Sequence, residues 1–233
     1  MIVPRIAPRI APRIARREAL GGALGGIAAL LAPGMARAAA LPVPPANRLG
    51  FDVMMGSRKL GSHELVFHPQ GDGLLVDVVV DLAYRIGPMT LFRYTHTARE
   101  RWTGGQVAEL TTQTNENGTH YKVDARRENG VFVVQPPGHP SYAAPADALP
   151  ATHWNRHELD GPLINTQNGE LLRPQIAPEG LSSVAAADGK PLRVRKYALS
   201  GPVKLNLWYD EAQQWAGLSF VKGGFEVRYA RRG

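Results

Sequence analysis

Between Leu74 and Ile86, every even-numbered residue is apolar or aromatic, and the odd-numbered positions hold the charged residues Asp77, Asp81 and Arg85. Successive side chains of a β-strand point to opposite faces of a sheet, so a period of two over this length predicts a strand with one buried face. A Gly-Asp-Gly turn precedes the segment, and Gly87-Pro88 follows it. We therefore expect this strand near the centre of the fold.

The same alternation recurs along most of the chain. Asn115 to Gly118 and Asn129-Gly130 are hairpin signals, since Asn and Gly tolerate positive φ, and such short connections require antiparallel neighbours. The fold class predicted is all-β, with an antiparallel meander that forms a strongly curved sheet or an open barrel. Besides 74–86, the predicted strands are 51–55, 60–68, 90–102, 106–114, 119–127, 131–135, 192–200, 203–210, 214–221 and 225–231.

Residues 136–190 interrupt this pattern. Prolines between Pro136 and Pro150 cannot pair in central strands, so the segment is predicted to be a long irregular loop with one short helix near 152–159. Long loops inside compact domains tend to be functional. We expect this one to cover the open mouth or edge of the sheet.

Residues 1–40 have the order of an export signal. The pair Arg16-Arg17 precedes a Gly- and Ala-rich apolar run from Gly21 to Leu31, and small residues at Ala36–Ala40 suit cleavage. The run is too short to span a membrane and weakly hydrophobic, which favours twin-arginine export. The prediction is a signal peptide at 1–40 and a single periplasmic or secreted β-rich domain at 41–233, with no transmembrane segment in the mature chain.

Charge and cysteine content exclude several classes of protein. The net charge is +7, but residues 1–40 hold six arginines and one glutamate, which leaves +2 for residues 41–233. The predicted domain is thus nearly neutral, which argues against nucleic acid as a partner. Because there is no cysteine, disulfides and thiolate chemistry are excluded.

The predicted strand 90–102 carries the first group of candidate site residues. Its even-numbered face holds Phe92, Tyr94, His96, Glu100 and Trp102, whereas arginines and threonines occupy the other face. A buried His and a buried carboxylate in aromatic surroundings suit a binding or acid–base site. The alternative is structural, with each group satisfied by a neighbouring side chain or loop carbonyl.

The loop supplies the remaining candidates: His153, Trp154, Asn155 and Gln167. On a helix, His153 and His157 would share one face at i, i+4, but the glutamate of the zincin pattern is absent, so we predict no metal site. Packing of His153 and Trp154 against the sheet is the preferred interpretation. Gln167 could bond a polar ligand or its own loop's backbone.

Several motifs together resemble an uncharacterised bacterial family of exported proteins known as a domain of unknown function. The resemblance covers residues 47–231 and implies export and a β-rich fold, but no activity. A more distant similarity to periplasmic curved-sheet proteins, some of which bind lipids, concerns architecture alone. The segments that carry the family resemblance are Phe51 to Val53 with Gly56, Gly61 to His63, Phe92 to His96, Thr152 to Asn155, Ile164 to Gln167 with Gly169, and Leu207 to Asp210 with Trp215 to Leu218.

Three functions fit these features. The leading prediction is a periplasmic binding or chaperone-like protein with an apolar, aromatic-lined cavity, whose partners are an apolar or amphipathic small molecule and, during export, the twin-arginine translocase; no cofactor is predicted. A structural subunit of a cell-envelope complex, using an exposed Trp208, is one alternative. An envelope hydrolase with His96 or His153 as base and Glu100 as acid is the other. A sizeable cavity would favour binding, and a His–carboxylate contact of about 3 Å would favour catalysis.

Overall fold

The computed structural model describes residues 41–233, so the predicted export segment lies outside the described residues. The prediction of an all-β antiparallel fold is confirmed. Thirteen strands form one sheet in the order β12-β13-β14-β15-β16-β1-β2-β3-β4-β5-β6-β7-β8. They are β1 (Arg48–Met55), β2 (Arg58–Gln70), β3 (Gly73–Ile86), β4 (Met89–Thr103), β5 (Gln106–Glu116), β6 (Thr119–Glu128), β7 (Val131–Gln135), β8 (Tyr142–Ala144), β12 (Gln175–Ala185), β13 (Pro191–Ser200), β14 (Leu205–Asp210), β15 (Trp215–Lys222) and β16 (Phe225–Arg231).

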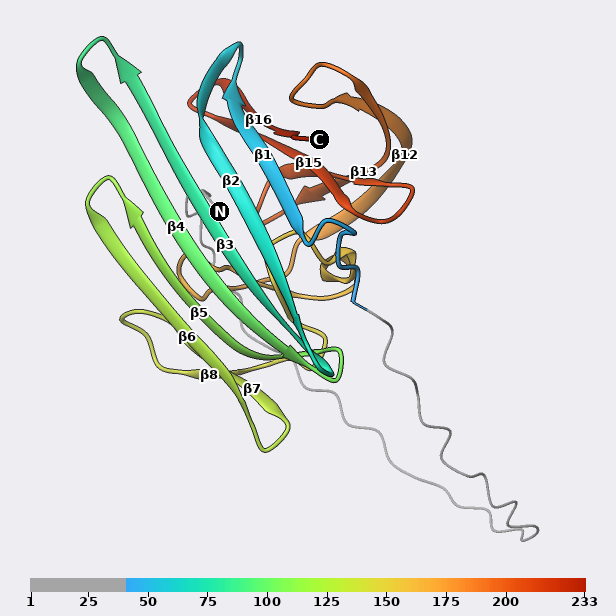
Figure 1. The fold of residues 1–233 in the computed structure, drawn as a ribbon. Helices are drawn as coiled ribbons and strands as arrows, with labels where there is room; N and C mark the ends of the chain where they lie inside the picture. Colours follow the sequence, from blue (N-terminus) through green and yellow to red (C-terminus); the bar gives the residue numbers. More distant parts are fainter. Residues whose placement is uncertain (1–40) are drawn as a thin grey trace, which may run out of the picture.

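The long strands β2 to β5 form a curved wall (Figure 1). As the alternation predicts, β3 lies in the middle of the sheet, and its even-numbered residues from Leu74 to Leu82 are buried. The predicted hairpin turns also form: Asn117 and Gly118 both have positive φ, as do Asn129 and Gly130. These turns keep consecutive strands antiparallel, so the wall is a meander.

The sheet curls strongly but does not close, since β8 and β12 remain its two edges. At one end the curl brings β15 to β4 and β5: Lys222 Nζ lies 3.3 Å from Glu116 Oε1 and 5.0 Å from the centroid of the Phe92 ring. Elsewhere, the amide of Ala187, just after β12, donates to the Arg231 carbonyl of β16. The concave face is therefore almost enclosed by its own strands.

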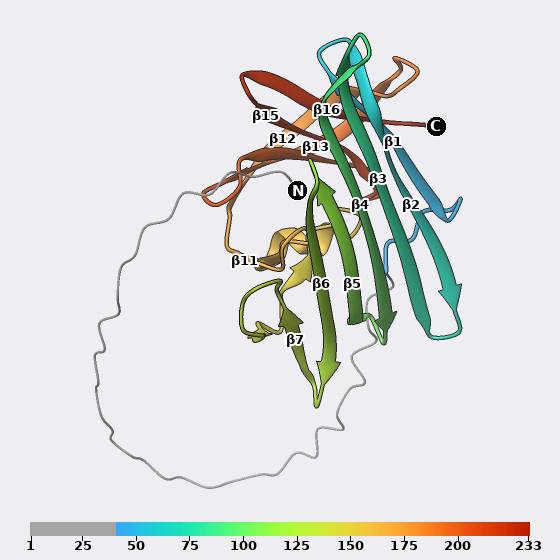
Figure 2. The same ribbon diagram turned by 90° about the vertical axis from the view of Figure 1, so that its left-hand side faces the viewer.

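A single segment, residues 145–174, joins the two edge strands β8 and β12 and crosses the concave face (Figure 2). We call it the crossing segment. It contains a small three-stranded sheet of β9 (Leu149–Pro150), β10 (Leu163–Ile164) and β11 (Leu171–Leu172) and the 3-10 helix η1 (Arg156–Asp160). Its apolar side chains belong to the same core as those of the wall, so the segment fills the interior of the sheet.

Two predictions for residues 136–190 are wrong. Residues 175–185 are strand β12, not loop; β12 is an edge strand whose largely exposed residues have no apolar alternation, and its bulge between Pro178 and Gly180 accommodates the proline. The predicted helix at 152–159 is instead the five-residue η1, capped by Asn155. His153 precedes it with φ of 70°, so His153 and His157 do not share a helical face.

Trp208 is covered, and it does not form an exposed patch. Its side chain is 8% exposed and packs in a small second cluster with Val194 and Ala216. That cluster lies on the opposite face of β14 from Leu205, Leu207 and Tyr209, as the alternation predicts. Within residues 41–233, no helix has the length and apolar character needed to cross a membrane.

Candidate functional site

The enclosed interior has two halves of different character. In the first, Trp102 of the wall packs against Trp154 of the crossing segment with ring centroids 5.2 Å apart, and Phe67 contacts Trp154 at 5.3 Å. Both contacts are edge-to-face, a favourable aromatic geometry. We call this the filled half, because its side chains pack around the fully buried carboxylate of Glu100.

Glu100 is fully buried and accepts three hydrogen bonds. Thr152 Oγ1 donates to Oε1 at 2.5 Å, and the indole nitrogens of Trp102 and Trp154 donate to Oε2 at 2.7 and 3.0 Å. Burial raises the pKa of the Glu100 carboxyl, and these hydrogen bonds oppose that shift. With its acceptor sites used in this way, Glu100 ties the crossing segment to β4.

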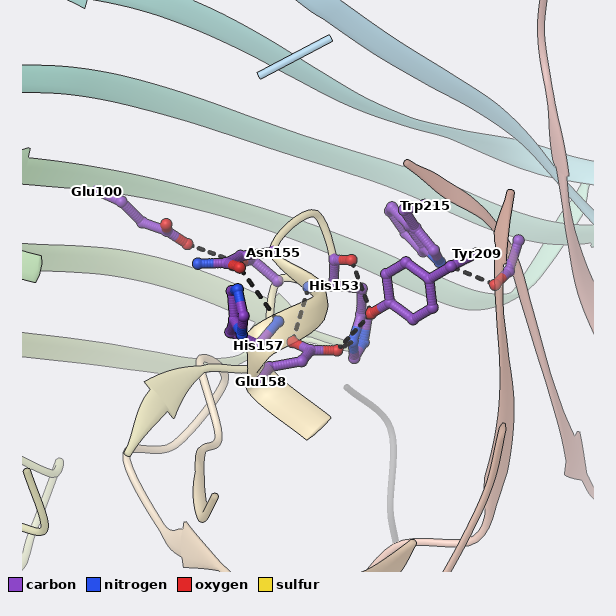
Figure 3. Close-up of polar contacts among 9 residues, drawn as sticks. Glu100, His153, Asn155, His157, Glu158, Tyr209 and Trp215 are labelled. Carbon is purple, nitrogen blue, oxygen red and sulfur yellow. Dashed lines mark hydrogen bonds and ion pairs between the residues drawn. The ribbon is translucent and has the colours of Figure 1, made fainter. Parts of the chain in front are cut away.

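A second carboxylate, Glu158 of η1, organises His153 (Figure 3). Glu158 Oε1 lies 2.7 Å from His153 Nδ1, and Oε2 accepts from the His153 backbone amide at 3.0 Å. The Tyr209 hydroxyl lies 3.0 Å from the His153 carbonyl oxygen and 3.2 Å from Glu158 Oε1. These contacts hold His153 in its left-handed backbone conformation, and they engage Nδ1, the ring nitrogen nearer the backbone.

The second half of the interior, the hollow half, contains a cavity of about 50 Å³. Strands β2 to β4 and β14 to β16 form its wall, and the crossing segment borders it on the other side. Its lining is mixed: apolar Ala, Val, Leu and Phe side chains surround three histidines, two threonines and two tyrosines. Apart from the exposed Lys204, the lining residues with polar side-chain atoms are His63, His96, His153, Thr152, Thr166, Tyr94 and Tyr229.

His63 has both ring nitrogens buried with no hydrogen-bond partner. Its ring is enclosed by Phe51, Trp215 and Tyr229, with centroids 6.2, 5.1 and 5.7 Å away. Burial lowers the pKa of His63 well below its usual value, and the nearby His153 lowers it further. An imidazole in these surroundings is neutral at pH 7 and presents one donor and one acceptor.

His96, from β4 on the other side of β3, is also neutral. Its Nδ1 lies 2.8 Å from Thr114 Oγ1, and burial lowers its pKa to about 3. Tyr94 stacks beside it with ring centroids 6.3 Å apart. The cavity is therefore bordered by neutral imidazoles from two strands and by His153 from the crossing segment.

The residues predicted from the sequence separate into groups. Tyr94, His96 and His153 line the cavity, whereas Glu100, Trp102 and Trp154 form the filled half. Asn155 caps η1 through the His157 amide. The remaining two lie at the end of the sheet where Lys222 contacts β4 and β5: Phe92 under Lys222, and Gln167 bonded to Glu116.

Sequence reasoning missed His63 as a site residue. The signal was present, because His63, Leu65 and Phe67 alternate along β2 and all three are buried. Among the residues that the structure describes, no cluster of three or more His, Asp or Glu side chains has the geometry to hold a metal ion.

Comparison with solved structures supports the architecture. The chain is similar to a β-barrel-like protein of domain of unknown function DUF1849 from Brucella abortus, with a TM-score of 0.56 and 11% identity over 79% of this chain and 94% of that one. At that identity the similarity concerns the fold alone. None of the curated proteins matches this sequence. Residues 51–232 match a family model, and the chain therefore belongs to the family described as Domain of unknown function (DUF6134).

Proposed function

We propose that this protein binds a small amphipathic molecule in the hollow half, with the three histidines as its polar contacts. The observation that carries the proposal is His63, whose two ring nitrogens are buried beside a cavity without a partner. A buried polar group without a hydrogen bond lowers the stability of a protein by about 1–3 kcal/mol, so such groups are uncommon and often have a functional reason. A bound molecule would supply the missing hydrogen bonds.

The lining also indicates the chemistry of the molecule. Neutral His63 suits a hydroxyl or carbonyl group, since its imidazole offers one donor and one acceptor. His96 can add its Nε2 alone, because its Nδ1 is bonded to Thr114. Val78, Val80 and Leu218 suit an apolar body. Among the described lining residues, Lys204 is the only lysine, arginine, aspartate or glutamate, and its side chain is exposed. An uncharged amphipathic molecule therefore fits better than an ion.

The size of the cavity limits what can enter without movement. A volume of about 50 Å³ accommodates about three or four water-sized groups. The polar end of a ligand fits that space, and a longer molecule would have to extend out of it or displace the crossing segment. The predicted apolar, aromatic-lined cavity is thus replaced in the proposal by a small one with a mixed lining.

A hydrolase is the second candidate, favoured by the 2.7 Å contact between His153 Nδ1 and Glu158. A carboxylate that orients a histidine through Nδ1 is a recurring arrangement for a general base. The carboxylate is Glu158, however, and not the predicted Glu100. The hydroxyl of Thr152 already donates to Glu100, so it is not free to serve as a nucleophile activated by His153.

The binding proposal is tested by native mass spectrometry of the purified protein and of His63→Leu. We expect the protein to retain a small molecule, and the variant to lose it while remaining as stable as the parent, because leucine removes the unsatisfied nitrogens. His120→Leu, a change at an exposed histidine of β6, is the control and should retain the molecule. Equal retention in His63→Leu, or no retained mass in the parent, would contradict the proposal.

We propose that the protein acts outside the cytoplasm after twin-arginine export, on the basis of Arg16-Arg17 and the small residues at Ala36–Ala40. Replacing both arginines by lysine should leave unprocessed precursor in the cytoplasm, as measured by fractionation and immunoblotting. Normal processing of this double variant would rule out the twin-arginine route.

A further inference from the structure

Exposed apolar side chains gather on two hairpin tips. Eight large apolar side chains of the described residues are exposed, and five of them lie on these tips. The β3–β4 tip carries Ile86, Met89 and Leu91, which are 55%, 62% and 50% exposed. The β15–β16 tip carries Val221 and Phe225, at 71% and 63%. Such clustering is unusual for a surface whose exposed apolar residues are otherwise scattered singly.

These tips belong to one end of the molecule, together with the β1–β2 tip. Arg58 Nη1 of the β1–β2 tip donates to the Arg85 carbonyl at 2.7 Å, which joins it to the β3–β4 tip. Lys222 of the β15–β16 tip lies over the Phe92 ring of β4. Both ribbon views place the β1–β2 and β3–β4 tips at the upper end (Figures 1 and 2). We call residues 56–59, 84–91 and 221–226 the hairpin rim.

The hairpin rim is basic. It contains the cations Arg58, Lys59, Arg85 and Lys222 and one acidic residue, Glu226, whereas residues 41–233 as a whole carry a net charge of only +2. Lys59 and Lys222 pair with acidic residues behind the rim, at 2.9 and 3.3 Å. Neither Arg58 nor Arg85 forms an ion pair with any of the described acidic residues.

The cavity lies close behind this rim. Phe220, which lines the cavity, directly precedes Val221, and Leu82 is two residues before the rim segment of β3. Lys204, the exposed lining residue, marks where the cavity approaches the surface. The filled half, with Trp102 near the far end of β4, lies away from the rim.

We propose that the hairpin rim docks on the surface of an anionic lipid bilayer. Apolar side chains on separate tips can insert between lipid headgroups while the neighbouring cations contact anionic headgroups, the same division of roles that holds amphipathic segments at membranes. Charge complementarity favours a bilayer over a second copy of this chain, since two basic rims would repel each other. Docking requires no ligand in the cavity, so it stands independently of the binding proposal.

Vesicle flotation tests the docking. The purified protein should float with vesicles of equal phosphatidylglycerol and phosphatidylcholine and not with vesicles of phosphatidylcholine alone, and salt should weaken the association. The double variant Met89→Ser, Phe225→Ser should bind about tenfold more weakly, because two inserted side chains are lost. Leu181→Ser is the matched control, since Leu181 is 71% exposed but lies on β12, away from the rim.

Fluorescence locates the contact. All four native tryptophans are buried, so their emission should not change when vesicles are added, and a change seen in a variant can be assigned to its introduced tryptophan. Phe225→Trp should shift its emission to shorter wavelength on addition of the anionic vesicles, and Leu181→Trp should not. Absence of flotation, equal shifts at both positions, or self-association through the rim in analytical ultracentrifugation would overturn the proposal. His63→Leu should float like the parent, which separates docking from ligand binding.

Discussion

The filled and hollow halves of the interior are built from the same strands, but they differ in packing and in the hydrogen bonding of their buried polar groups. On β3 and β4, Val76 and Trp102 belong to the core that includes the crossing segment, and Trp102 contacts Trp154, whereas Val80 and His96 border a cavity. In the filled half, the buried polar group Glu100 has three hydrogen bonds. In the hollow half, His63 has none. The buried carboxylate of the filled half thus has its hydrogen bonds within the protein, whereas the buried imidazole of His63 in the hollow half lacks them.

Truncation in the filled half should have the largest effect. Trp154→Ala removes a fully buried ring and one of the hydrogen bonds to Glu100, so the free energy of unfolding should fall by about 3–5 kcal/mol. Urea denaturation followed by circular dichroism measures it. Phe225→Ala, at an exposed position, is the control and should change stability by less than about 0.5 kcal/mol. A loss below about 1 kcal/mol in Trp154→Ala would show that the crossing segment does not stabilise the sheet.

Overpacking distinguishes the halves on a single strand. Val76→Phe inserts a ring where there is no space and should cost about 1–3 kcal/mol of stability. Val80→Phe, four residues along the same face of β3, directs the ring toward the cavity and should cost less than about 1 kcal/mol. Thermal unfolding of both variants gives the comparison. Equal losses would mean that the cavity is not available space.

The pH dependence of stability should give the smallest effect and belongs mainly to the hollow half. The folded-state pKa of His96 is about 3, and that of His63 is also lowered. When the pH is below the ordinary histidine pKa of about 6.5, these two side chains therefore bind protons in the unfolded chain and not in the folded one. Stability should therefore fall as pH falls through 6.5, by on the order of 1 kcal/mol between pH 7 and 6.

His63→Leu provides the matched measurement for that effect, since it should remove about half of the dependence between pH 7 and 6. Glu100 has the opposite sign: its pKa is raised by burial, so its contribution is lost as pH rises above the ordinary carboxyl value. A pH profile that is identical in His63→Leu and the parent would show that His63 does not titrate on unfolding as proposed.

The candidate residues on strands were easier to predict than those in the crossing segment. Parity along 90–102 placed Tyr94, His96, Glu100 and Trp102 on the buried face, and all four are buried there. No β-bulge intervenes between Phe92 and His96 to reverse the faces. By contrast, the face that His153 and His157 would share on a helix does not form. The Glu158 carboxylate accepts from the His153 amide and the Tyr209 hydroxyl donates to the His153 carbonyl, and His153 takes a left-handed conformation ahead of the short 3-10 turn.

By itself, the sequence determined the strands that alternate, though not the edge strand β12, together with the hairpin turns and the side of each alternating strand that faces inward. These features depend on alternation and on residues one or two positions apart. Only the tertiary structure decided which groups meet inside. The contact of Lys222 with Glu116 spans 106 residues, and that of Trp154 with Glu100 spans 54. Such contacts depend on the curl of the whole sheet and on the path of the crossing segment between its two edges. Neither feature produces a periodic pattern of residues that could be recognised in the sequence.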